Sequence, residues 1–198
     1  MFFLRRPTDQ QVLTLLAARE SVPFSYSDVG GTRLSPPAGW RINHMRQFIG
    51  TGKAAYEKAV WALFSWQLLA IDGLQVFPCK TPLQPNTDVA ILSRHFGIWS
   101  ADFCRVIYVL RDQPEKSGEI LRSGFGYGTL PGHAVRGEEI FSIEWHPGTE
   151  DVWYDIYSFS LPANPLIRLL GPVARATQKR FARASLQKAV QLAGSNGK

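Results

Sequence analysis

The sequence predicts one α+β domain in which a curved antiparallel sheet of seven strands wraps around a long C-terminal helix beginning near Pro165. Three observations lead to this prediction. The chain has 198 residues, which fits a single domain. Six short β-rich runs follow one another with turn-forming residues between them, and the last part of the chain then shows helical spacing of its apolar residues.

The first expected element is a short helix that precedes the main domain. Thr8 and Gln11 are spaced as a capping box, apolar residues recur at helical spacing to about Glu20, and Pro23 ends the segment. The expected organisation is one domain over residues 1–198, with a helical extension over residues 1–22, a sheet-and-helix domain over residues 24–192 and a frayed tail over residues 193–198.

The main domain is expected to begin with a strand and a helix and to continue as a meander. An extended segment is expected over residues 40–49, and a helix over residues 53–69 follows the turn at Gly50-Thr51-Gly52. Six further strands are expected over residues 74–79, 88–96, 103–111, 120–130, 138–146 and 152–161. Consecutive strands with short connections favour an antiparallel sheet over a βαβ arrangement.

The C-terminal helix has a clear expected start and an expected interruption. Asn164 is a favoured N-cap residue and Pro165 a favoured first helical residue, whereas Gly171 and Pro172 should kink or divide the helix. The net charge is +6, and the segment from Asn164 onward has seven basic and no acidic residues. A basic helix face can contact an anionic membrane or an acidic partner, although a solvated face is the simpler explanation.

The order of elements resembles the helix-grip fold of the START and birch-pollen-allergen superfamily. Members of that superfamily commonly bind lipids, sterols, polyketides or plant hormones, and a few are cyclases or hydrolases. The resemblance implies a cavity between the sheet and the long helix. The chain is 12% aromatic, which suits both a core and the lining of such a cavity.

Several short motifs resemble a family called domain of unknown function 1990. They are Tyr26-Ser27-Asp28-Val29-Gly30, Gly39-Trp40-Arg41-Ile42-Asn43-His44, Ile49-Gly50-Thr51-Gly52, Tyr127-Gly128-Thr129-Leu130-Pro131-Gly132-His133 and Gly137-Glu138-Glu139-Ile140-Phe141. The resemblance covers roughly residues 24–186, and the motif from Tyr127 to His133 is its most specific part. Trp40 stands where the family has Tyr, and Asn43 stands where Asp is usual, which leaves His44 without a neighbouring carboxylate in the sequence. The family implies a fold and no established activity.

His44 and Arg46 are the first candidate site residues. They lie two residues apart on an expected strand, so their side chains share one face. On the concave face they can hold an anionic group or take part in acid–base chemistry. The alternative is an exposed pair at the edge of the sheet.

A glycine pattern lies in the expected strand over residues 120–130. Gly124, Gly126 and Gly128 leave one strand face bare, and tight packing or curvature is favoured because no GxGxxG or P-loop spacing is present.

His133 and the pair Glu138 and Glu139 have residue types that suit an acid–base pair or a metal site. Their spacing matches no metal motif. A salt bridge of Glu138 or Glu139 with Arg136 or Arg175 is favoured instead.

The leading functional hypothesis is a binding protein for a small apolar or amphipathic molecule between sheet and helix. The expected ligand contacts are His44, Arg46, Trp66, Arg105, Tyr127, Trp153 and Tyr157. The alternative is a hydrolase or cyclase on the same scaffold, for which the candidate catalytic residues are His44, Tyr127, His133 and Glu139. The lack of a nucleophile with a paired base favours binding over catalysis.

A third hypothesis is weak contact of the basic C-terminal helix with an anionic membrane or an acidic partner. No nucleic-acid-binding motif, cofactor motif or metal motif is present, and no pattern fixes the oligomeric state. Cys79 and Cys104 form no CxxC motif, and the start of the chain does not resemble a signal peptide. A cytoplasmic location is therefore expected.

Overall fold

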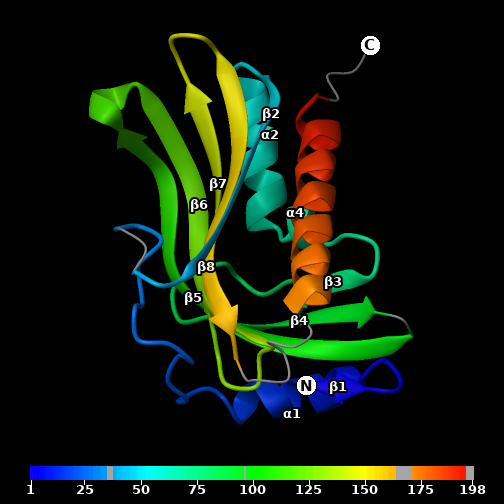
Figure 1. Cartoon of the computed structure of the whole chain (residues 1–198). Coiled ribbons are helices and arrows are strands. Elements are labelled where there is room, and N and C mark those ends of the chain that lie inside the picture. The colour runs from blue at the N-terminus through cyan, green and yellow to red at the C-terminus, as the bar shows by residue number, and fades with distance from the viewer. Residues whose placement is uncertain (35–37, 96, 164–170, 195–198) are drawn as a thin grey trace.

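The computed structural model describes residues 1–34, 38–95, 97–163 and 171–194, and its main feature is a curved antiparallel sheet around two helices (Figure 1). The strand order is β2-β8-β7-β6-β5-β4-β3, and the short strand β1 pairs with β5. The strands are β1 Phe2–Phe3, β2 Arg41–Thr51, β3 Leu74–Phe77, β4 Asp88–His95, β5 Ile98–Glu115, β6 Ile120–Thr129, β7 Val135–His146 and β8 Asp151–Pro162. The helices are α1 Asp9–Ala17, α2 Lys53–Phe64 and α4 Gly171–Gly194, with 3₁₀ turns η1 Gln67–Leu69 and η2 Lys116–Gly118.

The main core lies on the concave face of the sheet, which we call the inner face. Helix α2 contributes Tyr56 and Leu63, α4 contributes Leu186, and β6 and β7 contribute the fully buried rings of Phe125 and Phe141. Burying each such side chain stabilises the fold by about 1.5–3 kcal/mol, so these contacts hold both helices against the sheet.

A second, smaller core lies on the convex face, which we call the outer face, where α1 covers β4 and β5. Val12 and Leu16 of α1 pack with Phe103 of β5. The capping box at Thr8 and Gln11 is present. The helix therefore begins where its capping signal predicted, and it ends at Ala17, before the expected end near Glu20.

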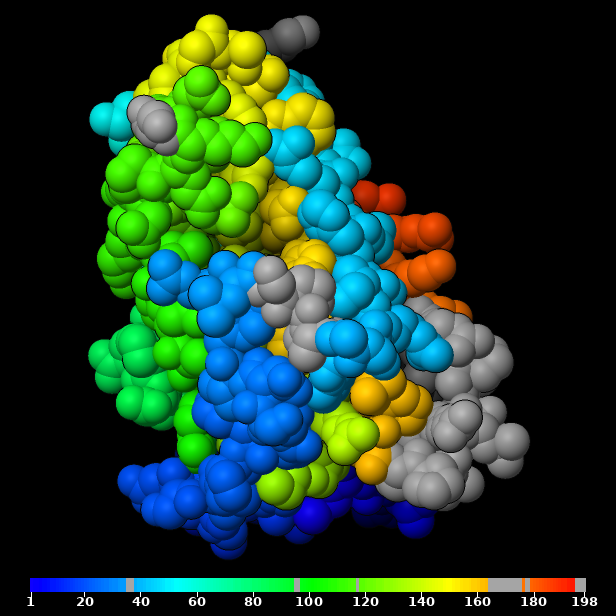
Figure 2. All heavy atoms as spheres, turned by 60° about the vertical axis from the view of Figure 1, so that its left-hand side comes forward, coloured from blue at the N-terminus to red at the C-terminus, as the bar shows by residue number. Residues whose placement is uncertain are grey.

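Residues 24–34 cover another part of the outer face. Figure 2 shows this segment, in blue, lying across the green and yellow strands. A Cβ atom added to Gly126 would lie 2.7 Å from Tyr108 Cε1, and one added to Gly128 would lie 2.9 Å from Tyr26 Cε1. Gly126 and Gly128 therefore make room for tyrosine rings, and a Cβ atom at Gly124 would lie 2.8 Å from Ser142 Cα, so the expectation of tight packing is confirmed.

The structure confirms the expected antiparallel sheet and changes details of its boundaries. The seven expected strands correspond to β2–β8, and β1 is an eighth strand that periodicity could not reveal in two residues. The expected helix start at Asn164 and Pro165 lies outside the described residues. Gly171 and Pro172 fall in the first turn of α4 as described, where proline is tolerated because the first helical N–H groups have no partner in the helix. In the part of the chain that the structure covers, no helix is both long and apolar enough to cross a membrane.

Candidate functional site

Tyr127 and Glu139 form a polar pair on the inner face. Antiparallel pairing of β6 with β7 sets the two residues directly opposite each other, so their side chains share that face. The Tyr127 hydroxyl donates to Oε2 of Glu139 at 3.1 Å. Burial raises the pKa of Glu139 to about 7, and the hydrogen bond from Tyr127 only partly opposes this shift. Burial, and then the Glu139 charge, raise the pKa of Tyr127 well above its ordinary value.

The Glu139 carboxyl group is surrounded by protein, whereas the residue as a whole is half-buried. Glu139 begins a row of paired residues that runs across neighbouring strands. It is paired with Ser158 of β8, and Ser158 is paired with Asn43 of β2. Among the side chains that the structure describes, no Lys, Arg or His forms an ion pair with Glu139.

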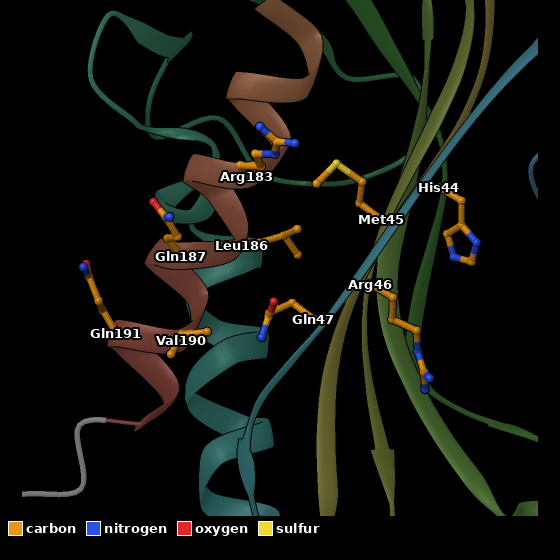
Figure 3. Close-up of a pocket in the computed structure, with 9 residues that line it drawn as sticks. All are labelled: His44, Met45, Arg46, Gln47, Arg183, Leu186, Gln187, Val190 and Gln191. Carbon is orange, nitrogen blue, oxygen red and sulfur yellow. The ribbon is translucent and has the colours of Figure 1, made fainter. Parts of the chain in front are cut away.

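An open groove of about 750 Å³ separates β2 from α4 (Figure 3). Its lining residues are His44, Met45, Arg46, Gln47, Arg183, Leu186, Gln187, Val190 and Gln191. Met45 and Gln47 point from the strand toward the helix, while Leu186 and Val190 point back toward the strand (Figure 3). The side chains that face one another across the groove are therefore three apolar ones, Met45, Leu186 and Val190, and the amide of Gln47.

His44 and Arg46 border this groove, but their ring and guanidinium group point away from α4, onto the outer face (Figure 3). The expectation that they face the cavity is therefore not met. His44 Nε2 lies 2.7 Å from Oδ2 of Asp155, and Arg46 donates to Oε2 of Glu144 at 2.7 Å. The carboxylate that the sequence lacks beside His44 is supplied by Asp155 on the neighbouring strand β8.

An ion-pair cluster surrounds these two residues on the outer face. Arg122 and Arg46 both contact Glu144. Burial opposes ionisation of Glu144, but the two arginines outweigh it and lower its pKa. Burial raises the pKa of Asp155, against the effect of His44. Sequence analysis missed this cluster because its members come from four strands, and only the strand register brings them together.

The remaining expected ligand contacts are divided between the two faces. Trp66 lies on the inner face, is 3% exposed and donates from Nε1 to the Thr81 carbonyl. Trp153 lies on the outer face under the Arg46 guanidinium, whose Cζ is 4.4 Å from the ring centre, and Tyr157 meets the His44 ring edge to face.

Arg105 pairs with Asp88 and donates to the carbonyls of Arg19, Glu20 and Val22, so it holds the N-terminal extension rather than lining the inner face.

The four candidate catalytic residues do not converge. Tyr127 and Glu139 are in contact, but His44 is on the opposite face of the sheet. His133 Nδ1 lies 4.0 Å from Oδ1 of Asp102, and burial lowers its pKa.

The expected salt bridge to Arg136 is wrong for both glutamates. Glu138 accepts hydrogen bonds from Tyr26 and Thr32, and Arg136 stacks over Trp40. The Arg175 side chain lies outside the described ones. No group of His, Cys, Asp and Glu side chains suited to a metal ion occurs among the residues covered.

Comparison with known proteins gives a family and a fold. The model of the family described as "Domain of unknown function (DUF1990)" matches residues 25–188. A UPF0548 protein of Deinococcus radiodurans is 38% identical over 206 residues, covering 98% of this chain and 100% of the relative. A hypothetical protein of Helicobacter pylori, jhp0584, superposes with a TM-score of 0.50 at 11% identity, covering 85% of this chain and 95% of the other, which is a likeness of fold alone. A START superfamily protein of Mycobacterium smegmatis gives a TM-score of 0.47 at 12% identity, covering 78% and 99% of the two chains.

Proposed function

The chain belongs to the DUF1990 family, and on this START-like fold we propose that it binds a small amphipathic molecule between its sheet and helix α4. The observation that carries the proposal is the Glu139 carboxyl group on the inner face. It is enclosed by protein, it has one hydrogen-bond donor among the described side chains, and the residue as a whole is only half-buried. A carboxyl group in an otherwise apolar core is costly, so its presence there favours a functional role over a structural one.

The groove between β2 and α4 supports the same proposal. Its volume of about 750 Å³ lies within the range of small-molecule sites, which is roughly 300–1,000 Å³. Met45 lines the groove and also packs against the main core. Asn43, the next inner-face residue along β2, lies in the same row as Ser158 and Glu139. An elongated ligand with its apolar part in the groove would extend toward Glu139 with its polar end.

Binding is favoured over hydrolysis or cyclisation because the expected catalytic set is split between two faces of the sheet. His44 is on the outer face, where Asp155 holds it. Glu139 and Tyr127 remain as a pair that can hydrogen-bond a ligand.

The proposal is tested by measuring binding of a neutral apolar fluorophore, N-phenyl-1-naphthylamine, together with native mass spectrometry of the purified protein for retained ligands. Val190→Trp should fill the groove and weaken fluorophore binding about fivefold or more, because Val190 lines the groove. Val29→Trp is the matched control, since both valines have similar exposed fractions, 39% for Val190 and 42% for Val29. The proposal fails if the fluorophore does not bind, or if both variants bind it as the natural protein does.

A further inference from the structure

We propose that the polar end of the ligand is an organic cation, a protonated amine, whose ammonium group binds the Glu139 carboxylate beside the Tyr127 hydroxyl. The inference rests on the proposed function, since it names the chemical class of the molecule bound between sheet and helix. It excludes fatty acids and other amphipaths with an anionic head.

The first argument compares Glu139 with the other enclosed carboxylates of the chain. Asp88 is paired with Arg105, and Glu144 is paired with Arg46 and Arg122. Buried carboxylates are ordinarily neutralised by a cation or by several donors in this way. Glu139 has a single phenol donor and no cation partner among the described side chains, and a ligand ammonium would supply the opposite charge.

The second argument concerns the groups that face Glu139 from each neighbouring element. Tyr127 on β6, Cys104 on β5 and Tyr154 on β8 have pKa values raised by burial and also by the Glu139 charge. They stay neutral at pH 7 and provide no positive charge. Asn43 on β2 and Ser158 on β8 are uncharged.

Helix α4 also presents no described cation to Glu139. Lys179, Arg180 and Arg183 are exposed, and Lys188 donates to the Ala70 carbonyl. A second carboxylate or a phosphate placed beside Glu139 would therefore meet a like charge with no compensating group among the described side chains. An ammonium group would instead meet an opposite charge in a site of low dielectric constant.

The protonation state of Glu139 makes the affinity for an amine depend on pH, whereas binding of an uncharged apolar molecule would not depend on it. An ammonium group binds the ionised carboxylate, and the pKa of Glu139 is about 7 in the free protein. At about pH 6 the Glu139 carboxyl group is protonated in most molecules and must lose its proton before the amine binds. At about pH 8 it is already ionised in most molecules. The affinity for an amine should therefore rise about tenfold between these two pH values.

The test compares decylamine, decanol and decanoate, which have the same chain length and differ in the charge of the head. Each is titrated against the fluorophore-loaded protein at about pH 6 and about pH 8. We expect decylamine to displace the fluorophore at about tenfold lower concentration than decanol at about pH 8, and decanoate to be the weakest. Glu139→Gln should abolish the advantage of decylamine and its pH dependence while leaving decanol unchanged. Glu119→Gln, which removes one exposed negative charge elsewhere, should leave all three unchanged.

The outcomes separate the two proposals. If decanol or decanoate displaces the fluorophore as well as decylamine does, the cation inference is wrong and the binding proposal stands. If none of the three displaces it and the fluorophore itself does not bind, both are wrong. If Glu139→Gln and Glu119→Gln weaken decylamine equally, the amine responds to net charge and Glu139 is not its site.

Discussion

Replacement of Glu138 by alanine should cost this protein a large part of its stability. Glu138 is 2% exposed on the outer face and accepts hydrogen bonds from the Tyr26 hydroxyl at 2.8 Å, the Gly30 N–H at 2.7 Å and the Thr32 N–H at 3.0 Å. The Thr32 hydroxyl donates to the same carboxylate. This one side chain therefore fastens residues 24–34 to β7.

The expected cost follows from these donors. A hydrogen bond to a charged group contributes about 1.5–3 kcal/mol, so the three donors with ordinary distances would together give about 4.5–9 kcal/mol. Removing the carboxylate also removes the cost of burying it, and some of the freed donors would reach water. We therefore expect Glu138→Ala to lower the free energy of unfolding by about 3–5 kcal/mol, against a total of about 5–15 kcal/mol for an ordinary domain.

The assay is urea denaturation followed by tryptophan fluorescence, with the slope of the transition checked for change. Tyr26→Phe removes one donor and should cost about 1–2 kcal/mol, and Glu138→Gln, which keeps one acceptor oxygen, should fall between the two. These milder variants keep the comparison measurable if Glu138→Ala does not fold. A cost below about 1 kcal/mol for Glu138→Ala would refute the argument, because the segment would then be held by its other contacts.

Three further predictions concern other elements. Burial raises the pKa of the Glu139 carboxyl group to about 7, so the folded state is penalised only when this group is ionised. In the same assay, Glu139→Gln should therefore leave the free energy of unfolding unchanged below about pH 4.5 and raise it by up to about 3 kcal/mol above about pH 8. Arg105→Met should speed amide hydrogen exchange over residues 9–22, because Arg105 donates to three carbonyls at the end of that segment; unchanged exchange would contradict this role. Gly126→Ala should cost about 1–3 kcal/mol through overlap with Tyr108, whereas Gly148→Ala, with open space around its position, should be neutral in urea denaturation.

The order of elements could be predicted because each depends on local signals. The capping residues of α1, the turn residues between strands and the period-two pattern of β4–β8 are all readable within a few neighbouring residues. Which side chains of β2 point to the inner face and which to the outer face could not be predicted in this way. Arg41, Asn43, His44 and Arg46 place polar groups on both sides of that strand, because it lies at the sheet edge where neither side is fully buried. Met45 packs against the main core, and its position decides that His44 and Arg46 face outward.

The candidate site was partly predictable for the same physical reason. Tyr127 and Glu139 were singled out by residue type and motif, but their contact depends on the register of β6 with β7, which sequence spacing does not give. The outer-face cluster around Glu144 depends on the register of four strands and was missed completely. Contacts across a sheet are thus recoverable from sequence only when a tight hairpin turn fixes the register.

The adjacent residues Glu138 and Glu139 show why the inner-face carboxylate is the one to associate with function. They occur side by side in one motif, and strand alternation sends them to opposite faces. Glu138 meets donors from Tyr26, Gly30 and Thr32, and its charge is satisfied within the fold. Glu139 meets the Tyr127 hydroxyl and neutral neighbours, and burial raises its pKa to about 7. Among the described side chains, the fold thus surrounds one carboxylate with donors and gives its neighbour a single donor, and this difference is why we place the proposed ligand cation at Glu139 rather than at Glu138.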